Sequence, residues 1–258
     1  MTRNALVFAF SLLGTMTSAL LGASAMAADF DAVKSKLETA MASDIRTEAD
    51  TVRDRNRKPI ETLQFFGLRE DMKVVELMPG GGWYTKLLAP VLSDRGEFYV
   101  AIGAGRVETQ LKDKPGFEKM RVTAQDAQFQ RAEGSRFADL STTDLDVKNV
   151  DMVFTFRNYH NFSDSTRAAL NESVFKALKS GGVYAVVDHN RRHMQKLDNE
   201  NRRRVDPVLA IKEIQAAGFV FEDYSDLHYR PDDELQYEVG RATVTGNTDR
   251  WTLKFRKP

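Results

Sequence analysis

The sequence contains no cysteine at all. This absence excludes disulfide bonds, zinc sites built on thiolates, thiol nucleophiles and the lipid-bearing cysteine of a lipoprotein, and an oxidising compartment is therefore tolerated. Neither sign of charge dominates, because 37 Lys and Arg face 37 Asp and Glu. Composition thus gives no general argument for binding nucleic acid, and none is expected as a partner.

Long uncharged runs are also scarce, and one of them lies at the N-terminus. Arg3 supplies a positive charge, residues 5–13 form a compact apolar segment, and small residues follow as far as Ala25–Ala27. This pattern predicts a signal peptide over residues 1–27, cleaved after Ala27, and a periplasmic or secreted protein. Gly, Thr and Ser dilute the run too much for a comfortable membrane span, although an uncleaved anchor stays an alternative. No later segment approaches membrane-spanning length.

Residues 28–66 are expected to form a helical segment ahead of the main domain. Apolar residues at helical spacing predict a helix over 30–41, and residues 43–64 are densely charged with both signs. Two interpretations of the charged stretch stay open. It is either a solvated helix held by mixed-sign pairs, or a polar lid that folds over a ligand site.

From residue 67 to residue 258 short apolar segments alternate with helical ones. Strands are expected over 73–77, 97–102, 151–156, 183–187, 219–222 and 251–255. For the third strand in chain order, residues 122–129 and 135–140 both qualify, and 135–140 is preferred. Helices are expected over 84–92, from Ser163 to Gly181-Gly182, and from Asp206-Pro207 to Gly218. The alternation predicts a doubly wound, mostly parallel, seven-stranded Rossmann-like α/β sheet.

The strongest signal for chemistry is Val74–Thr85, where a buried strand runs through three glycines into a helix. Glycines let backbone amides approach a ligand closely, and the start of a helix favours an anionic group. In open α/β sheets ligands bind beyond the carboxyl ends of the strands. The acidic Glu76 at the strand end and four further strand–helix units strengthen this interpretation.

At these residues the chain resembles the class I S-adenosylmethionine-dependent methyltransferases. More specifically it is similar to an exported group of predicted methyltransferases whose signature is Pro-Gly-Gly-Gly-Trp-Tyr-Thr, here Pro79–Thr85. The resemblance covers roughly residues 45–258. The other matching segments, in order, are Arg57–Pro59, Phe65–Gly67, Thr155–Asn161, Gly181–Val183, Asp188-His189, Arg204–Pro207, Ala216–Phe219 and Phe255–Pro258.

The resemblance implies S-adenosylmethionine as cofactor and a small-molecule acceptor. It implies that the cofactor is held by Glu76, Pro79, Gly80, Gly81, Gly82, Tyr84 and Thr85. Two departures stand out. Met78 replaces a glycine of the general motif, and the second strand ends without the usual ribose-binding carboxylate. The adenine partner normally follows the third strand, and Asp139 is preferred there over Asp126.

Polar residues cluster at the end of the expected fourth strand, where the resemblance places the methyl group. Arg157, Asn158 and His160 are the candidate catalytic residues, and Asn161 is a candidate for binding substrate. His160 can serve as a base if the acceptor is a hydroxyl or an amine, and Arg157 can orient an anionic acceptor. The alternative is that Asn158 and Asn161 only cap the turn into the next helix.

The fifth strand and the loop after it carry further candidates. Asp188, His189 and Arg204 are expected to bind substrate. The spacing of His189 and His193 invites a metal reading, but no third ligand is evident, so no metal is expected. The arginine-rich stretch 191–204 is either solvated surface or a clamp for an anionic acceptor, and the polar segment 226–249 is a candidate lid.

Two functions from different classes follow. The leading hypothesis is an exported S-adenosylmethionine-dependent methyltransferase acting on a small molecule. The alternative is a non-catalytic exported ligand-binding protein on the same scaffold, which the export signal and the missing ribose carboxylate favour. An enzyme of altered chemistry in the same cleft is a third reading, because a scaffold alone does not define a reaction.

Overall fold

The structure is a computed structural model, and it describes residues 30–258. The signal peptide expected over residues 1–27 lies outside the described residues. Within 30–258 no helix combines the length and the apolar character needed to cross a membrane.

Seven strands form one sheet in the described part of the chain, as expected. They are β1 Lys73–Leu77, β2 Glu97–Ala101, β3 Arg121–Thr123, β6 Val150–Phe156, β7 Leu178–His189, β8 Val220–Ser225 and β9 Arg250–Arg256. Their order is β3-β2-β1-β6-β7-β9-β8, and β9 runs antiparallel to both of its neighbours. The central parallel strands β1 and β6 are almost wholly buried, which agrees with their largely apolar sequences, whereas β3 at the edge is only partly buried.

The preferred third strand, 135–140, is wrong. β3 pairs in parallel with β2, aligning Arg121 with Tyr99, and thus falls where the rejected candidate begins. Asp139–Leu140 instead forms β5, which pairs with β4, Phe129–Gln130, in a separate two-stranded sheet. The apolar character of this segment has another cause. Ala138 is buried, and its amide donates to the carbonyl of Asn161.

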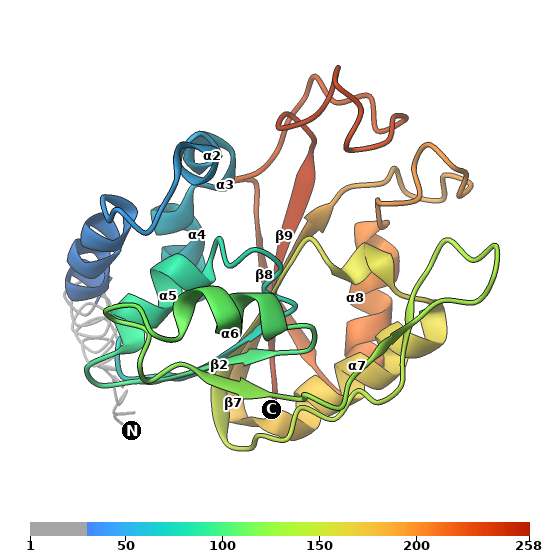
Figure 1. Cartoon of the computed structure of the whole chain (residues 1–258). Coiled ribbons are helices and arrows are strands. Elements are labelled where there is room, and N and C mark those ends of the chain that lie inside the picture. The colour runs from blue at the N-terminus through green and yellow to red at the C-terminus, as the bar shows by residue number, and fades with distance from the viewer. Residues whose placement is uncertain (1–29) are drawn as a thin grey trace, which may run out of the picture.

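Helices cover both faces of the sheet (Figure 1). One face packs against helix 30–41, α4 Pro59–Phe66, α5 Thr85–Leu92 and α6 Gly105–Leu111. The other packs against α7 Asp164–Ala177 and α8 Pro207–Ala216. Neighbouring strand residues alternate between the two cores: Val74 belongs to the first and Val75 to the second. This arrangement confirms the doubly wound prediction.

The expected helix starts after β6 and β7 are confirmed by their caps. The Ser163 hydroxyl accepts from the amide of Thr166, and the Asp206 carboxylate accepts from the amide of Val208. Gly218, expected to end α8, has a φ of +104°. The helix α7 was expected to end at Gly181-Gly182, but it ends four residues earlier, at Ala177. These glycines already belong to β7.

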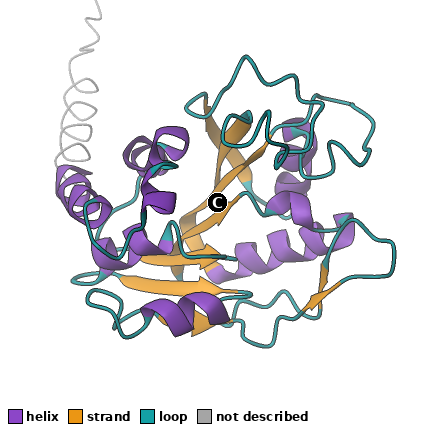
Figure 2. Ribbon diagram, turned by 45° about the horizontal axis from the view of Figure 1, so that its top comes forward, coloured by secondary structure: helices purple, strands orange, loops and turns teal. Residues whose placement is uncertain are grey.

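The charged stretch 43–64 is not one solvated helix. It breaks into α2 Glu48–Thr51, α3 Asp54–Arg57 and the start of α4, and Arg46, Asp50 and Arg57 are all buried. The opposite charges pair inward: Arg46 pairs with Asp54, and Asp50 pairs with Lys86 of α5. This stretch and the segment 226–249 rise at the same end of the sheet, where the long loops gather (Figures 1 and 2).

Candidate functional site

The carboxyl ends of four parallel strands share an unusual backbone feature. β1, β2, β3 and β6 are each followed by a non-glycine residue in the left-handed region, with φ of 51° at Met78, 61° at Ile102, 52° at Ala124 and 60° at Arg157. Such residues are uncommon, and a β-branched one is an outlier. Strained backbone of this kind gathers at functional sites, and here it marks the end of the sheet where the cavities described next lie.

A cavity of about 150 Å³ lies against the glycine turn after β1. Its lining comes from three parts of the chain: Arg53 and Arg57; Glu76–Gly81 with Trp83 and Tyr84; and Phe156, Arg157 and Asn158. The Tyr84 ring stacks on Phe156, and the guanidinium of Arg57 lies 4.3 Å from the centre of the Trp83 ring. The structure therefore brings the glycine turn together with the start of the polar cluster after β6.

Glu76 provides the buried carboxylate of this cavity. Its side chain accepts a hydrogen bond of 2.6 Å from the hydroxyl of Thr85. Burial raises the pKa of Glu76 to about 7, against the opposing effects of that hydrogen bond and of Arg57. No ion pair of Glu76 is present within residues 30–258, so this carboxylate is available to a cationic ligand. Thr85, expected to bind the cofactor, is fully buried and instead orients Glu76.

The three glycines of the turn differ in what surrounds them. A Cβ added to Gly80 or Gly81 would meet nothing within 4 Å, so a ligand can approach their backbone. A Cβ on Gly82 would lie 3.1 Å from Leu111 and 3.2 Å from Val107 of α6. Gly82 does not line the cavity, so its expected contact with the cofactor stays a prediction. It is needed for packing of the turn against α6.

A second cavity, of about 350 Å³, shares Arg53, Arg57 and Arg157 with the first. Its lining adds Asn56 of α3 and parts of the segment 239–246. It also adds polar residues between the end of β6 and the start of β9, namely His160, Asn161, His189, Arg203, Thr248 and Arg250. Asn161 and His189, both expected to bind substrate, lie on its wall. The candidate lid 226–249 supplies one side of it.

His160 and Asp188 form a hydrogen-bonded pair at the floor of the second cavity. The His160 ring nitrogen Nδ1 lies 2.6 Å from Asp188 Oδ1, and the His160 amide donates to Oδ2 at 2.9 Å. Asp188 has no exposed surface. Its carboxylate is taken up by the His160 ring and by backbone amides, and its binding of substrate stays a prediction. Its carboxylate fixes the imidazole so that Nε2 is left for the cavity, the arrangement of an oriented general base.

The capping interpretation fails for Asn158. It stands at the N-cap of η1, the 3-10 helix Tyr159–Asn161, but its side chain makes no cap hydrogen bond. Its Nδ2 donates instead to the carbonyls of Met78 and Phe156, each at 3.1 Å. Asn158 thereby ties the end of β1 to the end of β6 and holds the glycine turn beside Arg157.

Three other sequence candidates lie away from the two cavities. Arg204 is 1% exposed and makes a bidentate pair with Asp233 at 2.8 and 3.0 Å, which accounts for its charge without a substrate. His193 pairs with Asp206 and lines a different cavity from His189. The two histidines that could have formed a metal site are therefore apart. Asp139 accepts from the hydroxyls of Ser163 and Thr166 and lines neither cavity. Because β3 ends at Thr123, the acidic residue that follows the third strand is Asp126.

Sequence reasoning missed three arginines of the site, Arg53, Arg57 and Arg250. The first two were assigned to a solvated or covering stretch, and Arg250 begins the last strand. One signal pointed to Arg57, which opens the matched segment Arg57–Pro59. Nothing local marks Arg250, because it reaches the cavity only through the antiparallel pairing of β9 with β7.

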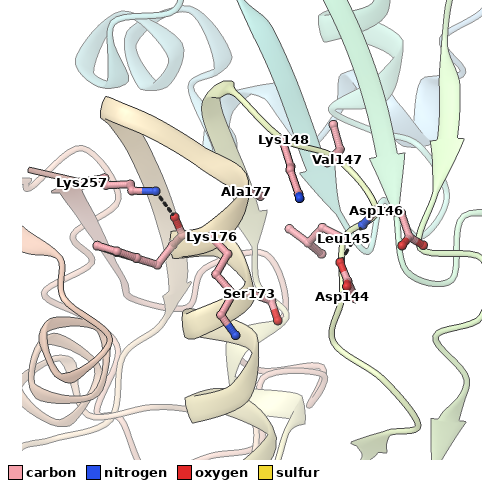
Figure 3. A pocket seen from close by; sticks show the side chains of 10 residues that line it. Asp144, Leu145, Asp146, Val147, Lys148, Ser173, Lys176, Ala177 and Lys257 are labelled. Carbon is pink, nitrogen blue, oxygen red and sulfur yellow. Dashed lines mark hydrogen bonds between the residues drawn. The ribbon is translucent and has the colours of Figure 1, made fainter.

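A larger hollow lies elsewhere. It measures about 900 Å³ and is lined by residues 144–148, by the last turns of α7 and by Lys257 (Figure 3). It lies at the amino end of β6, opposite to the glycine turn. Lys257 Nζ already donates to the carbonyls of Phe175 and Leu178. The chemistry is thus concentrated in the two smaller cavities.

Several solved structures have the same fold. A SAM-dependent methyltransferase from Aquifex aeolicus matches with a TM-score of 0.54 and 15% identity over 79% of this chain and 91% of that chain. The [4+2]-cyclase SpnF matches with a TM-score of 0.53 and 13% identity over 84% of this chain and 86% of that chain. Human N-acetylserotonin methyltransferase matches with 0.50 at 15% identity over 87% of this chain and 56% of that chain. These similarities show the class I methyltransferase fold.

No protein-family model matches the chain, and its sequence matches no curated protein.

Proposed function

We propose that this protein is an S-adenosylmethionine-dependent methyltransferase that acts on a small molecule bound in the second cavity. The observation that carries the proposal is the shared wall of the two cavities. Arg53, Arg57 and Arg157 line both the cavity at the glycine turn and the cavity over His160. A cofactor site and an acceptor site that share a wall bring two ligands next to each other, as group transfer requires.

The residues at the glycine turn fit the methionine end of this cofactor. The buried carboxylate of Glu76 suits its ammonium group, and the open backbone at Gly80 and Gly81 suits close approach of its carboxylate. The Arg57 guanidinium supplies a positive charge on the same wall. Human N-acetylserotonin methyltransferase, which shares the fold, is known in complex with SAM. When bound, the cofactor supplies an electrophilic methyl group.

The adenosine end fits less directly. β2 ends at Ala101 and is followed by Ile102 and Gly103, with no carboxylate for the ribose. A Cβ on Gly103 would lie 2.8 Å from the ring of Phe129, so this ring occupies the space over the end of β2. Phe129 belongs to β4 and is 52% exposed, and it moves aside in our proposal. We expect Phe129→Ala to tighten S-adenosylmethionine binding; weaker binding would contradict this.

His160 is the proposed base for an acceptor hydroxyl or amine. Asp188 holds its Nδ1, so that Nε2 accepts the proton at the cavity surface, and Asp188 acts as a positioning residue. Removing a positioned base costs roughly 10²–10⁴ in rate. We expect His160→Ala to bind S-adenosylmethionine like the wild type and to lose turnover by that factor. Wild-type turnover would remove His160 from the mechanism.

The deciding experiment is calorimetry with S-adenosylmethionine and with S-adenosylhomocysteine. Saturable binding of both, lost in Glu76→Ala, supports the enzyme. The matched control is Glu108→Ala, which removes an exposed carboxylate of α6 that pairs with Lys112. No binding of either ligand, even to Phe129→Ala, would overturn the proposal.

A second candidate function is a non-catalytic ligand-binding protein on this scaffold. The observation that favours it is the ring of Phe129 over Gly103, where a nucleoside is otherwise expected. In this case the second cavity would bind its ligand without S-adenosylmethionine, and His160→Ala would weaken that binding instead of slowing a reaction. Comparing the two effects of His160→Ala separates the candidates.

Export is proposed on the sequence pattern of residues 1–27. The basic Arg3, the apolar segment and Ala25–Ala27 together are typical of a cleaved signal peptide. N-terminal sequencing of the protein from a cell-envelope fraction should begin at Ala28. Intact protein with Met1 in the soluble cytoplasm would contradict export, and it would leave the methyltransferase proposal untouched.

A further inference from the structure

The second cavity is lined by five arginines and by no acidic residue. The five are Arg53, Arg57, Arg157, Arg203 and Arg250. Two of them are neutralised by neighbours outside the lining: Arg53 pairs with Asp50 at 2.6 Å, and Arg203 pairs with Glu238. Arg57, Arg157 and Arg250 have no ion pair within the described residues. We call these three residues the unpaired arginines.

Two of the unpaired arginines are buried, and the third, Arg157, is partly buried. Arg57 is 6% exposed and Arg250 is 7% exposed. Arg250 donates from Nη1 to the carbonyl of Asn56 at 2.8 Å, while its buried Nε has no acceptor. Burial lowers the pKa of each of the three, and repulsion from neighbouring arginines lowers it further. Buried cations without partners are costly, so a fold that keeps two buried guanidinium groups beside a partly buried third is built for an anion.

The backbone at Arg57 is held firmly in place. Its carbonyl accepts hydrogen bonds from the Thr62 hydroxyl at 2.9 Å and from His228 Nε2 at 3.0 Å. His228 is buried, and its other ring nitrogen accepts from the Thr252 hydroxyl at 2.7 Å. The charge at Arg57 is therefore carried by a preorganised element, although it lies in a stretch of short helices.

The charge count sets the class of ligand. Three guanidinium groups face the cavity, and the nearest carboxylate that acts on Arg157 and Arg250 is the buried Asp188. Asp188 offsets one guanidinium, and Glu76, with its raised pKa of about 7, offsets Arg57 only in part, so more than one positive charge remains for a ligand. Planar guanidinium groups bind the oxygens of phosphates and carboxylates in pairs, and His160 and Asn161 add polar groups on the same wall.

We propose that the unpaired arginines bind a small acceptor that carries a doubly charged oxyanion group, either a phosphate or two carboxylates. Its role as the acceptor rests on the proposed function, whereas binding of the dianion rests on the cavity alone. Anchored by its charge, the molecule lies between His160 and the wall shared with the glycine turn. The unpaired arginines thus select for an acceptor with this charge, and the bound dianion neutralises them.

The experiment is calorimetry of the full chain without S-adenosylmethionine, using inorganic phosphate, malonate and acetate as probes. We expect saturable binding of phosphate or malonate and much weaker binding of the singly charged acetate. Preference for phosphate assigns a phosphorylated acceptor, and preference for malonate assigns a dicarboxylate. Equal binding of acetate, or no binding of either dianion, would overturn the proposal.

Arg157→Met tests the assignment to residues, with Arg241→Met as the matched control. Arg241 forms an exposed pair with Glu200 and lies outside the cavity, so its loss changes net charge equally. We expect Arg157→Met to weaken dianion binding about 30-fold or more and Arg241→Met to leave it unchanged. Equal weakening in both variants would mean a general charge effect and would overturn the proposal. Circular dichroism establishes that both variants are folded.

Separate titrations distinguish this proposal from the proposed function. Dianion binding without S-adenosylmethionine binding would overturn the methyltransferase and keep the anion site. S-adenosylmethionine binding without dianion binding would keep the methyltransferase and overturn the anion site.

Discussion

Arg204 is a fully buried arginine and Arg157 a partly buried one, and their surroundings are opposite. The guanidinium of Arg204 is enclosed by Asp233 and by the carbonyls of Tyr237 and Asn190. Arg157 makes no side-chain hydrogen bond or ion pair within the described residues, and it faces two cavities. Arg204 therefore belongs to a complete structural ion pair. Arg157 lacks a partner in the protein, and we infer that a ligand provides one.

The difference teaches that pairing, more than burial or charge, separates structural from functional ions in this protein. The same contrast holds for acids, since Asp233 is paired with Arg204 while Glu76 receives only the Thr85 hydroxyl. A paired ion stabilises the empty protein, whereas an unpaired one costs stability until a ligand binds. Substitutions on the two sides of this contrast should therefore act in opposite directions.

The largest effect on stability is expected at the ion pair of Arg204 and Asp233. Asp233→Ala leaves Arg204 buried and uncompensated, and it should lower the free energy of unfolding by about 3–5 kcal/mol. Denaturant titration measures this loss. The double variant Arg204→Met, Asp233→Leu should recover part of it, because no charge is then left buried. A loss below about 1 kcal/mol for Asp233→Ala would break the contrast.

An intermediate effect is expected from the titration of Glu76. Its pKa of about 7 lies above the ordinary 4.5, so the folded protein holds a proton that the unfolded chain has lost. Stability from this group is therefore present at low pH and declines as pH rises from about 4.5 to 7. Binding of a cationic ligand needs the ionised form and follows the opposite course. Affinity for S-adenosylmethionine should be about tenfold lower at pH 6 than at pH 8. Calorimetry at the two values checks it, and Glu76→Gln should abolish the dependence.

The smallest effect is expected at the unpaired arginines in the absence of ligand. Arg157→Met removes a partly buried charge that has no partner, and it should leave the free energy of unfolding unchanged or raise it by about 1 kcal/mol in anion-free buffer. Denaturant titration of both proteins checks the sign. With a saturating dianion present the order should reverse, because wild type alone gains binding energy. Destabilisation in both buffers would place Arg157 with the structural ions.

The sequence was sufficient for most of the fold but for less of the site. Periodicity and caps located β1, β2, α5, α7 and α8, because these elements follow local rules. β3 was misplaced because three residues carry little pattern, and its identity depends on pairing with β2.

Within the site, His160 and Arg157 could be predicted, since both follow β6 directly. The role of Arg204 could not, because its partner Asp233 is remote in sequence and only tertiary structure shows the pair. Gly80 and Gly82 look equivalent in a run of three glycines. They differ only because α6 packs against one of them, which no local rule reveals.

The left-handed backbone at Arg157 has a consequence for how this position responds to random substitution. The residue is unfavourable in two independent ways, through its φ of 60° and through its unpaired charge. Substitutions usually lower the stability of a protein. At position 157, however, glycine removes the strain of the positive φ and also removes the unpaired charge. Without selection for binding, random substitutions at this position should therefore replace arginine, because several of them raise the stability of the protein. In a library sorted for folding alone, position 157 should shed its arginine, whereas a library sorted for ligand binding should keep it.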